Sequence, residues 1–176
     1  MAHHIYRTRG LILGSVATGE ANRFYKIFTE ELGLIGATAQ AVREGKSKLR
    51  YSLQNYDWVK LDLVSGKSGW KIISGAEERA YPFIQQNEHT RKIFARMCLL
   101  IIRLVQGEER DSDLFSELLS VAEFLERREM ARTLHVYFET LLTLRILIRL
   151  GYVDPAPYTQ FSESNNYSLE LLESFK

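Results

Sequence analysis

Residues 57–74 read DWVKLDLVSGKSGWKIIS, and this stretch decides the fold of the first half of the chain. Polar and apolar side chains alternate over Asp57–Val64, which is the period of a half-buried strand. One face carries Trp58, Lys60 and Asp62, and the other carries Val59, Leu61 and Leu63. Ser65–Gly69 is rich in glycine and serine, so it predicts a hairpin connection to a second strand at Trp70–Ser74.

Three more strands are predicted upstream of this hairpin, at Arg9–Val16, Phe24–Thr29 and Leu34–Val42. Five short strands in the first 80 residues match a small closed barrel, and we predict the five-stranded OB-fold. The same periodicity also fits an SH3-like barrel. Lys46–Leu53 is a predicted short helix between strands three and four. Apolar side chains occur at both odd and even positions of the second strand, so the sequence does not show which of its faces points into the barrel.

The period changes to that of helices from about residue 78. The first predicted helix buries Ile93, Phe94, Met97, Leu100, Ile101, Leu104 and Val105, and ends at Gly107. The second follows candidate caps at Asp111–Asp113 and buries Leu114, Phe115, Leu118, Leu119, Ala122 and Leu125. A third runs from about Glu129 to Leu150, and Thr159–Lys176 has the pattern of one more short helix. The predicted class is α+β, with a barrel domain at 1–78 and an all-α helical domain at 79–176.

The composition is that of an ordinary globular chain, with 45% hydrophobic and 26% charged residues. No signal peptide is expected, because Met1–His4 is polar and two arginines follow closely. The longest apolar run, Leu134–Leu150, is interrupted by three charged residues, so it predicts a buried helix and not a membrane span. We therefore expect a cytoplasmic protein.

Residues that could carry covalent chemistry are scarce. The single cysteine, Cys98, lies on the apolar side of a predicted helix, and the four histidines share no metal-ligand spacing. No phosphate-binding loop, nucleophile elbow or dinucleotide turn occurs. We expect no enzyme activity, no cofactor and no metal.

The charge is distributed unevenly, although its net value is only +1. Residues 1–80 hold 12 Lys and Arg against 8 Asp and Glu, and four cations fall within Arg43–Tyr51. Cations beside aromatic rings on a barrel suit single-stranded nucleic acid, because phosphates pair with the cations and bases stack on the rings. A solvated surface loop gives the same pattern. The candidate stacking residues are Tyr6, Tyr25, Tyr51, Tyr56, Trp58 and Trp70.

The order of several short motifs resembles that of the RecO family of bacterial recombination mediators. The matching pieces are Thr8–Leu13, Gly19–Arg23, Ile27–Gly33, Ala39–Arg43, Lys46–Arg50 with Leu53-Gln54, and Gly75–Glu77. Downstream, Phe138-Glu139 through Leu150-Gly151-Tyr152 resembles the family's central helix and its exit. Two features depart from the family. Gln40 and Ala41 replace the usual Lys and Gly, and Val153–Tyr158 lacks the cysteines of the zinc module that many members carry there.

The resemblance implies a non-enzymatic DNA-binding protein that acts in recombinational repair near the nucleoid. Members bind single- and double-stranded DNA, anneal complementary strands and help to load the RecA recombinase, usually together with RecR. The alternatives are an RNA-binding OB-fold and a protein-interaction adaptor. The residues expected to bind DNA are Arg7, Arg9, Arg23, Lys26, Arg43, Lys46, Lys48, Arg50 and Tyr51.

A second surface is expected on the helical domain. Four cations recur there at helical spacing beside apolar residues, namely Arg91, Lys92, Arg96 and Arg103. In related proteins the acidic, apolar-ended tail of single-strand-binding protein docks on this domain, and a mixed cationic and apolar surface suits such a tail. Ordinary solvated arginines would give the same spacing.

Overall fold

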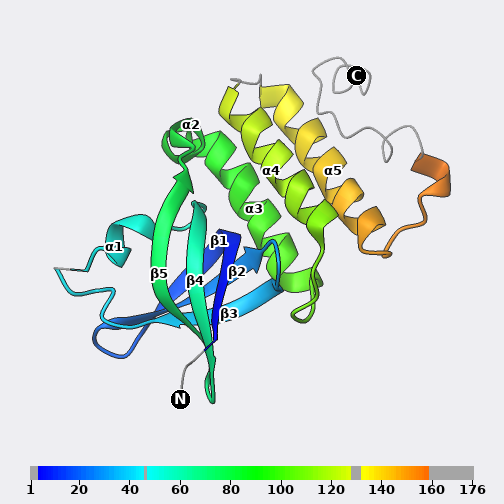
Figure 1. Cartoon of the computed structure of the whole chain (residues 1–176). Coiled ribbons are helices and arrows are strands. Elements are labelled where there is room, and N and C mark those ends of the chain that lie inside the picture. The colour runs from blue at the N-terminus through cyan, green and yellow to red at the C-terminus, as the bar shows by residue number, and fades with distance from the viewer. Residues whose placement is uncertain (1–3, 46, 128–131, 159–176) are drawn as a thin grey trace. The chain divides into compact units, whose positions relative to one another are not determined.

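The computed structural model describes residues 4–45, 47–127 and 132–158 (Figure 1). These residues form two compact units. The first comprises the chain up to Ala80 together with the segment Val105–Ser112. The second comprises Tyr81–Leu104 and the described chain from Asp113 onward.

The first unit is a closed five-stranded barrel. Its strands are β1 (Ile5–Thr18), β2 (Asn22–Thr29), β3 (Gly33–Ala39), β4 (Trp58–Gly66) and β5 (Gly69–Arg79). The order around the barrel is β1-β2-β3-β5-β4, in which β3 and β5 are parallel and all other pairs are antiparallel. A short helix, α1 (Leu49–Ser52), lies in the connection between β3 and β4. The chain therefore has the predicted OB-type barrel.

Two strands are longer than the sequence pattern predicts. β1 begins at Ile5 and not at Arg9, because it pairs with β4 over its first half and with β2 over its second half. The register shifts between Ile12 and Gly14, where the strand changes from one partner to the other. β5 continues past Ser74 to Arg79 opposite the start of β4. Each strand pairs with a neighbour on both edges, which closes the barrel. This pairing extends β1 and β5 beyond the segments that the sequence pattern predicts as strands.

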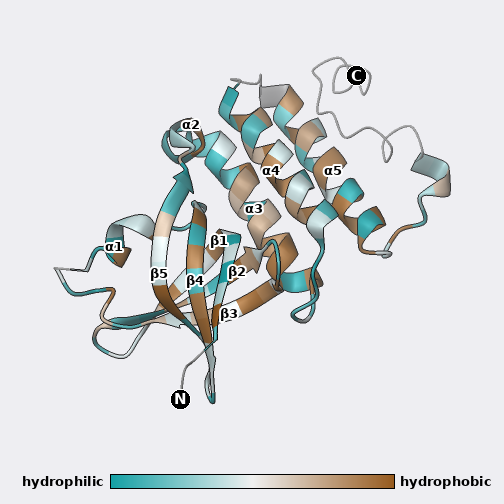
Figure 2. Cartoon of the chain, in the orientation of Figure 1, coloured by the Kyte–Doolittle hydropathy of each residue, from teal (hydrophilic) through white to brown (hydrophobic). Residues whose placement is uncertain are grey.

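The barrel core is built from inward side chains of all five strands. Its members are Ile12, Tyr25, Ile27, Ile35, Ala37, Ala39, Val42, Leu53, Val59, Leu61, Leu63 and Ile72. Hydrophobic and hydrophilic residues alternate along β4 in Figure 2, as the sequence predicts. Tyr25 and Ile27 settle which face of β2 points inward.

The rings of Trp58 and Tyr25 are each 1% exposed, so the prediction that they are stacking platforms is wrong. Alternation places Trp58 on the same face as the exposed Lys60. Trp58 is not a member of the barrel core, so it is buried on the face of β4 that alternation assigns to the outside. Tyr25 points into the core, where burial raises the pKa of its hydroxyl.

The second unit contains the helices α2 (Pro82–Gln86), α3 (Glu88–Leu104), α4 (Ser112–Arg127) and α5 (Arg132–Arg149), followed by a 3₁₀ turn, η1 (Ala156–Tyr158). Helices α3, α4 and α5 match the three predicted helices and run side by side in Figure 1. Helix α2 was not predicted. Proline begins it, and Ile84 is its one buried residue. The predicted helix at Thr159–Lys176 and the predicted start of the third helix at Glu129 lie outside the described residues.

Helices α4 and α5 are joined by both apolar and ionic contacts. The rings of Phe124 and Phe138 stack with centroids 5.1 Å apart. Arg145 Nε lies 2.8 Å from Glu117 Oε1, and Arg149 Nε lies 3.1 Å from the other oxygen of that carboxylate. The Arg145 and Glu117 side chains are 3% and 5% exposed. A paired buried arginine explains how a charge fits within the apolar α5. In the described chain no helix combines the length and apolarity that crossing a membrane requires.

Candidate nucleic-acid interface

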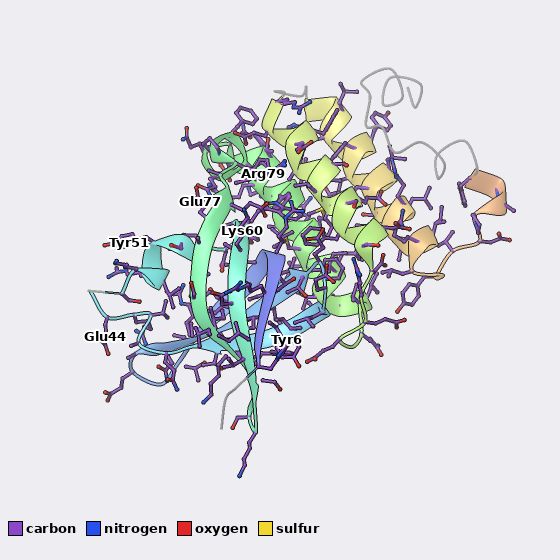
Figure 3. The ribbon with its side chains drawn as sticks, viewed as in Figure 1. Tyr6, Glu44, Tyr51, Lys60, Glu77 and Arg79 are labelled. Carbon is purple, nitrogen blue, oxygen red and sulfur yellow. The ribbon has the colours of Figure 1, made fainter. Side chains whose placement is uncertain are left out.

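The predicted basic loop connects β3 to β4 and is anchored by leucines. Leu49 packs against the barrel core and Leu53 is buried within it, so these i,i+4 residues turn one face of α1 inward. Arg50 and Tyr51 lie between them in sequence and are exposed. Figure 3 shows Tyr51 on α1 and Glu44 in the loop that precedes it. The helix is shorter than the predicted Lys46–Leu53 segment, and Lys46 itself lies outside the described residues.

A hollow of about 460 Å³ opens between α1 and the start of β2, and we call it the α1 hollow. It is lined by Arg23, Tyr25, Val42, Arg43, Arg50, Tyr51 and Gln54. Three of these residues are cations, and none of the described lining residues is acidic. The fold thus brings Arg23 of β2 beside Arg43 and Arg50 of the basic loop, which the sequence proposed only as separate candidates.

Arg23 is positioned by one weak hydrogen bond and keeps a free donor. Its Nη1 donates to Ser15 Oγ at 3.4 Å, and that hydroxyl in turn donates to Asn55 Oδ1 at 2.8 Å. The Nε atom of Arg23 is buried and has no hydrogen-bond partner in the described structure. A buried N–H without a partner costs about 1–3 kcal/mol, so a rearrangement of the Arg23 side chain that gave this donor an acceptor would be favourable.

The loop that carries Arg43 is held at its base by backbone contacts. The Arg43 amide donates to Ala21 O at 3.0 Å, and its Nη1 donates to Gly19 O at 3.1 Å. Asn22 Oδ1 accepts the Ala41 amide at 3.0 Å, in a segment where Ala41 has a φ of 53°. These bonds fix the loop against the β1–β2 turn.

Tyr51 is the one strongly exposed ring among the six candidate stacking residues. Its side chain is 71% exposed. Tyr6 and Trp70 meet edge to face with centroids 5.0 Å apart, and both are partly buried against the core. Trp70 Nε1 also donates to Glu108 Oε1 at 3.0 Å. Tyr56 is half-buried. The cations Lys48 and Arg50 have no side-chain partner among the described residues.

Arg7 and Arg9 line a different hollow of about 400 Å³, which we call the β1 hollow. It is lined by Arg7, Thr8, Arg9, Glu30, Glu31, Lys60, Leu61, Asp62, Ser74 and Ala76. Arg9 Nε lies 2.9 Å from both carboxylate oxygens of Glu78, and this hydrogen bond raises the pKa of the guanidinium. Arg7 Nε lies 3.4 Å from Asp62. Both predicted DNA-binding arginines of β1 therefore have acidic partners.

Lys26 lines neither hollow and lies on the outer face of the β2–β3 pair. Its Nζ is 6.0 Å from the ring centroid of Phe24. Across the strands, a Cβ on Gly36 would lie 2.5 Å from Phe24 Cζ, so only glycine lets this ring lie against β3. The sequence analysis missed Phe24 as an aromatic candidate. Its i,i+2 spacing from Lys26 and the glycine in the facing strand were the available evidence.

Comparison with known proteins identifies the barrel. Residues 1–78 match the model of the family described as Recombination protein O N terminal. Residues 1–78 therefore belong to this family. A DNA repair protein RecO of Dehalococcoides mccartyi (strain ATCC BAA-2266 / KCTC 15142 / 195) is 28% identical over 149 residues, which are 85% of this chain and 57% of that protein. The DNA repair protein RecO of Synechocystis sp. is 32% identical over 119 residues, which are 65% of this chain and 43% of that protein. The matched part of the chain therefore spans only about half the length of these relatives.

The predicted cations of the helical unit mostly have partners. Lys92 Nζ lies 2.6 Å from Glu88, and Arg96 contacts both carboxylate oxygens of Glu139 within 2.9 Å. Arg91 donates to the backbone oxygen of Gln85 at 2.7 Å. Arg103 has no side-chain partner among the described residues, so it is the member of this predicted partner surface that keeps its charge unpaired.

In the described part of the chain, no group of three or more His, Cys, Asp or Glu residues is arranged so that it could hold a metal ion. His89 and His135 approach each other with ring centroids 5.9 Å apart. Cys98 is buried in α3, and burial raises the pKa of its thiol far above the ordinary value. The cysteine is therefore a core residue, as its position on the apolar side of the helix predicts.

Proposed function

We propose that this chain is a DNA-binding recombination mediator that acts in recombinational DNA repair. It binds single-stranded DNA on the barrel, promotes annealing of complementary strands, and helps to load a recombinase. It carries out no covalent chemistry, and it works in the cytoplasm on nucleoid DNA. The similarity to proteins named DNA repair protein RecO supports this role.

The observation that carries the proposal is the α1 hollow. It collects Arg23, Arg43 and Arg50 without an acidic lining residue, beside the exposed ring of Tyr51. Cations neutralise phosphates, and an exposed ring offers a sequence-tolerant platform for a base. In other OB-folds, oligonucleotides bind on the face of strands 2 and 3 and on the adjoining β1–β2 and β4–β5 loops, and the Arg23 side of the α1 hollow lies on β2 beside the β1–β2 turn.

Annealing on such a surface needs no nucleophile. Two strands repel each other through their phosphates, and a bound cationic surface lowers that repulsion. Phosphate contacts hold a strand without reading it, so the choice of partner strand is left to base pairing. The protein therefore accelerates pairing of any complementary pair, and the sequence of the strands does not matter.

Fluorescence anisotropy with a labelled single strand at two salt concentrations tests DNA binding, and quenching of a dye pair on complementary strands tests annealing. We expect saturable binding that weakens with salt, and faster annealing than without protein. A labelled RNA of the same sequence serves as the comparison. Stronger binding to the RNA would favour an RNA-binding OB-fold, and no binding to either strand would favour a protein-interaction adaptor.

The proposed protein partners are RecR, RecA and single-strand-binding protein. Of these, the acidic tail of single-strand-binding protein can be examined on the structure. A negative, apolar-ended peptide fits a cation beside apolar side chains. On α3, Arg103 is the unpaired cation, and Leu99 one turn earlier is 51% exposed.

Arg103→Ala is therefore expected to weaken binding of a synthetic tail peptide more than Lys92→Ala, because Glu88 already holds Lys92. Isothermal titration at low salt measures both affinities. Equal losses in the two variants would point to general charge attraction. No binding by the unmodified protein would remove the tail as a partner of this surface.

A further inference from the structure

We infer that the α1 hollow is a site for one unpaired nucleotide, with the phosphate on its arginines and the base on Tyr51. The inference rests on the proposed function and adds a substrate preference to it. The hollow selects single strands over duplexes, and base pairing releases the strand from it.

The size of the hollow fits a small ligand. Its volume of about 460 Å³ lies within the range of about 300–1,000 Å³ in which proteins bury such molecules. Its floor includes the apolar Val42 and the ring of Tyr25, which are 2% and 1% exposed. The cations line the open part of the hollow, so the surface that it offers to a ligand is mainly polar and charged.

The phosphate side of the site is built before any ligand arrives. The backbone oxygen of Gly19 holds one nitrogen of Arg43, and Ser15 Oγ holds one nitrogen of Arg23. Each guanidinium has five N–H donors, so further donors remain beyond the bonded nitrogen. Guanidinium groups pair with phosphate oxygens through two parallel bonds, and that geometry suits Arg better than Lys.

The base side of the site is Tyr51. Its exposed ring lies on α1, Gln54 follows two residues after the end of that helix, and both residues line the hollow. The Gln54 Nε2 donates to the Arg50 backbone oxygen, which keeps its side chain against α1. Every base has a π-face, so stacking on Tyr51 holds a base of any identity.

A paired base cannot occupy this site, because both of its faces and its pairing edge are engaged inside the duplex. A single strand thus gains the phosphate contacts and one stacking contact, whereas a duplex gains the phosphate contacts alone. When two strands anneal, pairing withdraws the base from Tyr51 and weakens the hold on the product. The hollow therefore provides a means of releasing the duplex.

Three labelled probes of equal length separate the two sides of the site: an oligothymidylate strand, a strand with the same backbone but without bases, and a duplex. For Tyr51→Ala we expect an affinity loss of roughly 5- to 150-fold on oligothymidylate, the range for one base–aromatic stack. The loss on the base-free strand and on the duplex should stay within about twofold, because neither stacks. Tyr51→Phe should bind oligothymidylate like the unmodified protein, because the ring is kept.

Arg23→Gln should weaken all three probes, because it removes a phosphate contact and not a stack. Tyr152→Ala removes another exposed tyrosine, 56% exposed in the helical unit, and serves as the matched control without an effect. Equal losses for Tyr51→Ala on all probes, or no loss on oligothymidylate, would overturn the nucleotide site while DNA binding itself stands. Failure of the unmodified protein to bind any probe would instead overturn the proposed function.

Discussion

The α1 hollow and the β1 hollow lie on the same barrel and contain three cations each, but their charge environments differ. In the β1 hollow, Arg7, Arg9 and Lys60 stand among Glu30, Glu31 and Asp62. In the α1 hollow no described lining residue is acidic. In the β1 hollow the carboxylates neutralise the cations. In the α1 hollow the cations remain available to an anionic ligand. The number of cations thus does not decide which surface suits DNA.

The difference between the hollows originates in strand register. β1 pairs with β4 so that Arg7 faces Asp62, and the extension of β5 beyond the predicted Ser74 brings Glu78 to Arg9. Arg43 and Arg50 lie in the connection between β3 and β4 and not on a strand, so strand register does not place carboxylates opposite them. Cations in a loop of the barrel can therefore stay unpaired more easily than cations on one of its strands.

The largest expected effect is the loss of DNA affinity on removing the loop cations. The variant Arg43→Ala/Lys46→Ala/Lys48→Ala/Arg50→Ala should weaken binding to all sequences, because phosphate contacts do not read bases. If two to four of these cations touch phosphates, the log–log salt slope on single strands should shrink by about 1.4–2.8. Anisotropy titrations over a salt series measure that slope.

The matched control for the loop variant is Arg7→Ala/Arg9→Ala, which changes cations that already have partners. Its slope should shrink by less than the roughly 0.7 expected for one phosphate contact. Both tryptophans of the chain lie in the barrel, so tryptophan fluorescence shows whether each variant keeps a folded barrel. A folded loop variant with an unchanged slope, or a larger change in the control, would reverse the assignment of the two hollows.

The sequence predicted the barrel and most of its helices because those features depend on local periodicity. Alternation along Asp57–Val64 and the glycine-rich hairpin were sufficient for β4 and β5. Burial of Trp58 was not predictable in this way, because alternation places it on the same face as the exposed Lys60, outside the barrel core. Helix α2 was missed because five residues are too few to show a helical period.

The candidate site was predictable only in part. The cations of Arg43–Arg50 are neighbours in sequence and are recognisable as a cluster. Arg23 joins them only through folding, because the β1–β2 turn lies against the loop. Conversely, Arg9 and Glu78 are 69 residues apart, so no local pattern shows that this arginine is already paired. Long-range pairing decides which of the predicted residues stay available.

The next effect is on stability, because Arg9 forms an ion pair with Glu78 across the barrel. Its side chain is 31% exposed and that of Glu78 is 14% exposed. We expect Arg9→Gln to lower the free energy of unfolding of the barrel by about 1–2 kcal/mol, below the range for fully buried pairs because solvent reaches this one. Urea titration followed by tryptophan fluorescence measures it.

Arg7→Gln is the paired control for that measurement, since the Arg7 side chain is 83% exposed and its ion pair spans 3.4 Å. Its effect should stay within about 0.5 kcal/mol. Reactivity of Cys98 with a thiol reagent reports separately on the helical unit, because it is the single cysteine and is buried in α3. Equal destabilisation by both variants would mean that the ion pair of Arg9 with Glu78 adds no more stability than the exposed ion pair of Arg7.

A smaller effect on DNA binding is expected when the β1 hollow loses one carboxylate and so becomes more like the α1 hollow. Asp62→Asn removes the carboxylate that faces Arg7 and leaves the cation in place. We expect the salt slope for single-stranded DNA to grow by at most about 0.7, as one added phosphate contact would give. Asp154→Asn, in the helical unit, changes the net charge equally and is the control. Equal gains in both variants would show that net charge alone acts, and not the position of the freed arginine.

The smallest effect concerns an ion pair on α3 that solvent surrounds, Glu88–Lys92. A hydrogen bond from Lys92, aided by its charge, lowers the pKa of Glu88 below its ordinary value. A lowered carboxyl pKa means that the pair stabilises the helix above the pKa of the unfolded chain, and that this contribution disappears as the pH falls through the folded value. We expect Lys92→Ala to return the pKa of Glu88 toward the ordinary value, which carboxyl-carbon NMR titration measures directly. Arg103→Ala removes an unpaired cation from the same helix and should leave Glu88 unchanged. If both variants changed the pKa of Glu88 equally, the overall charge of the helix would control that pKa. The direct contact with Lys92 would then have no effect of its own.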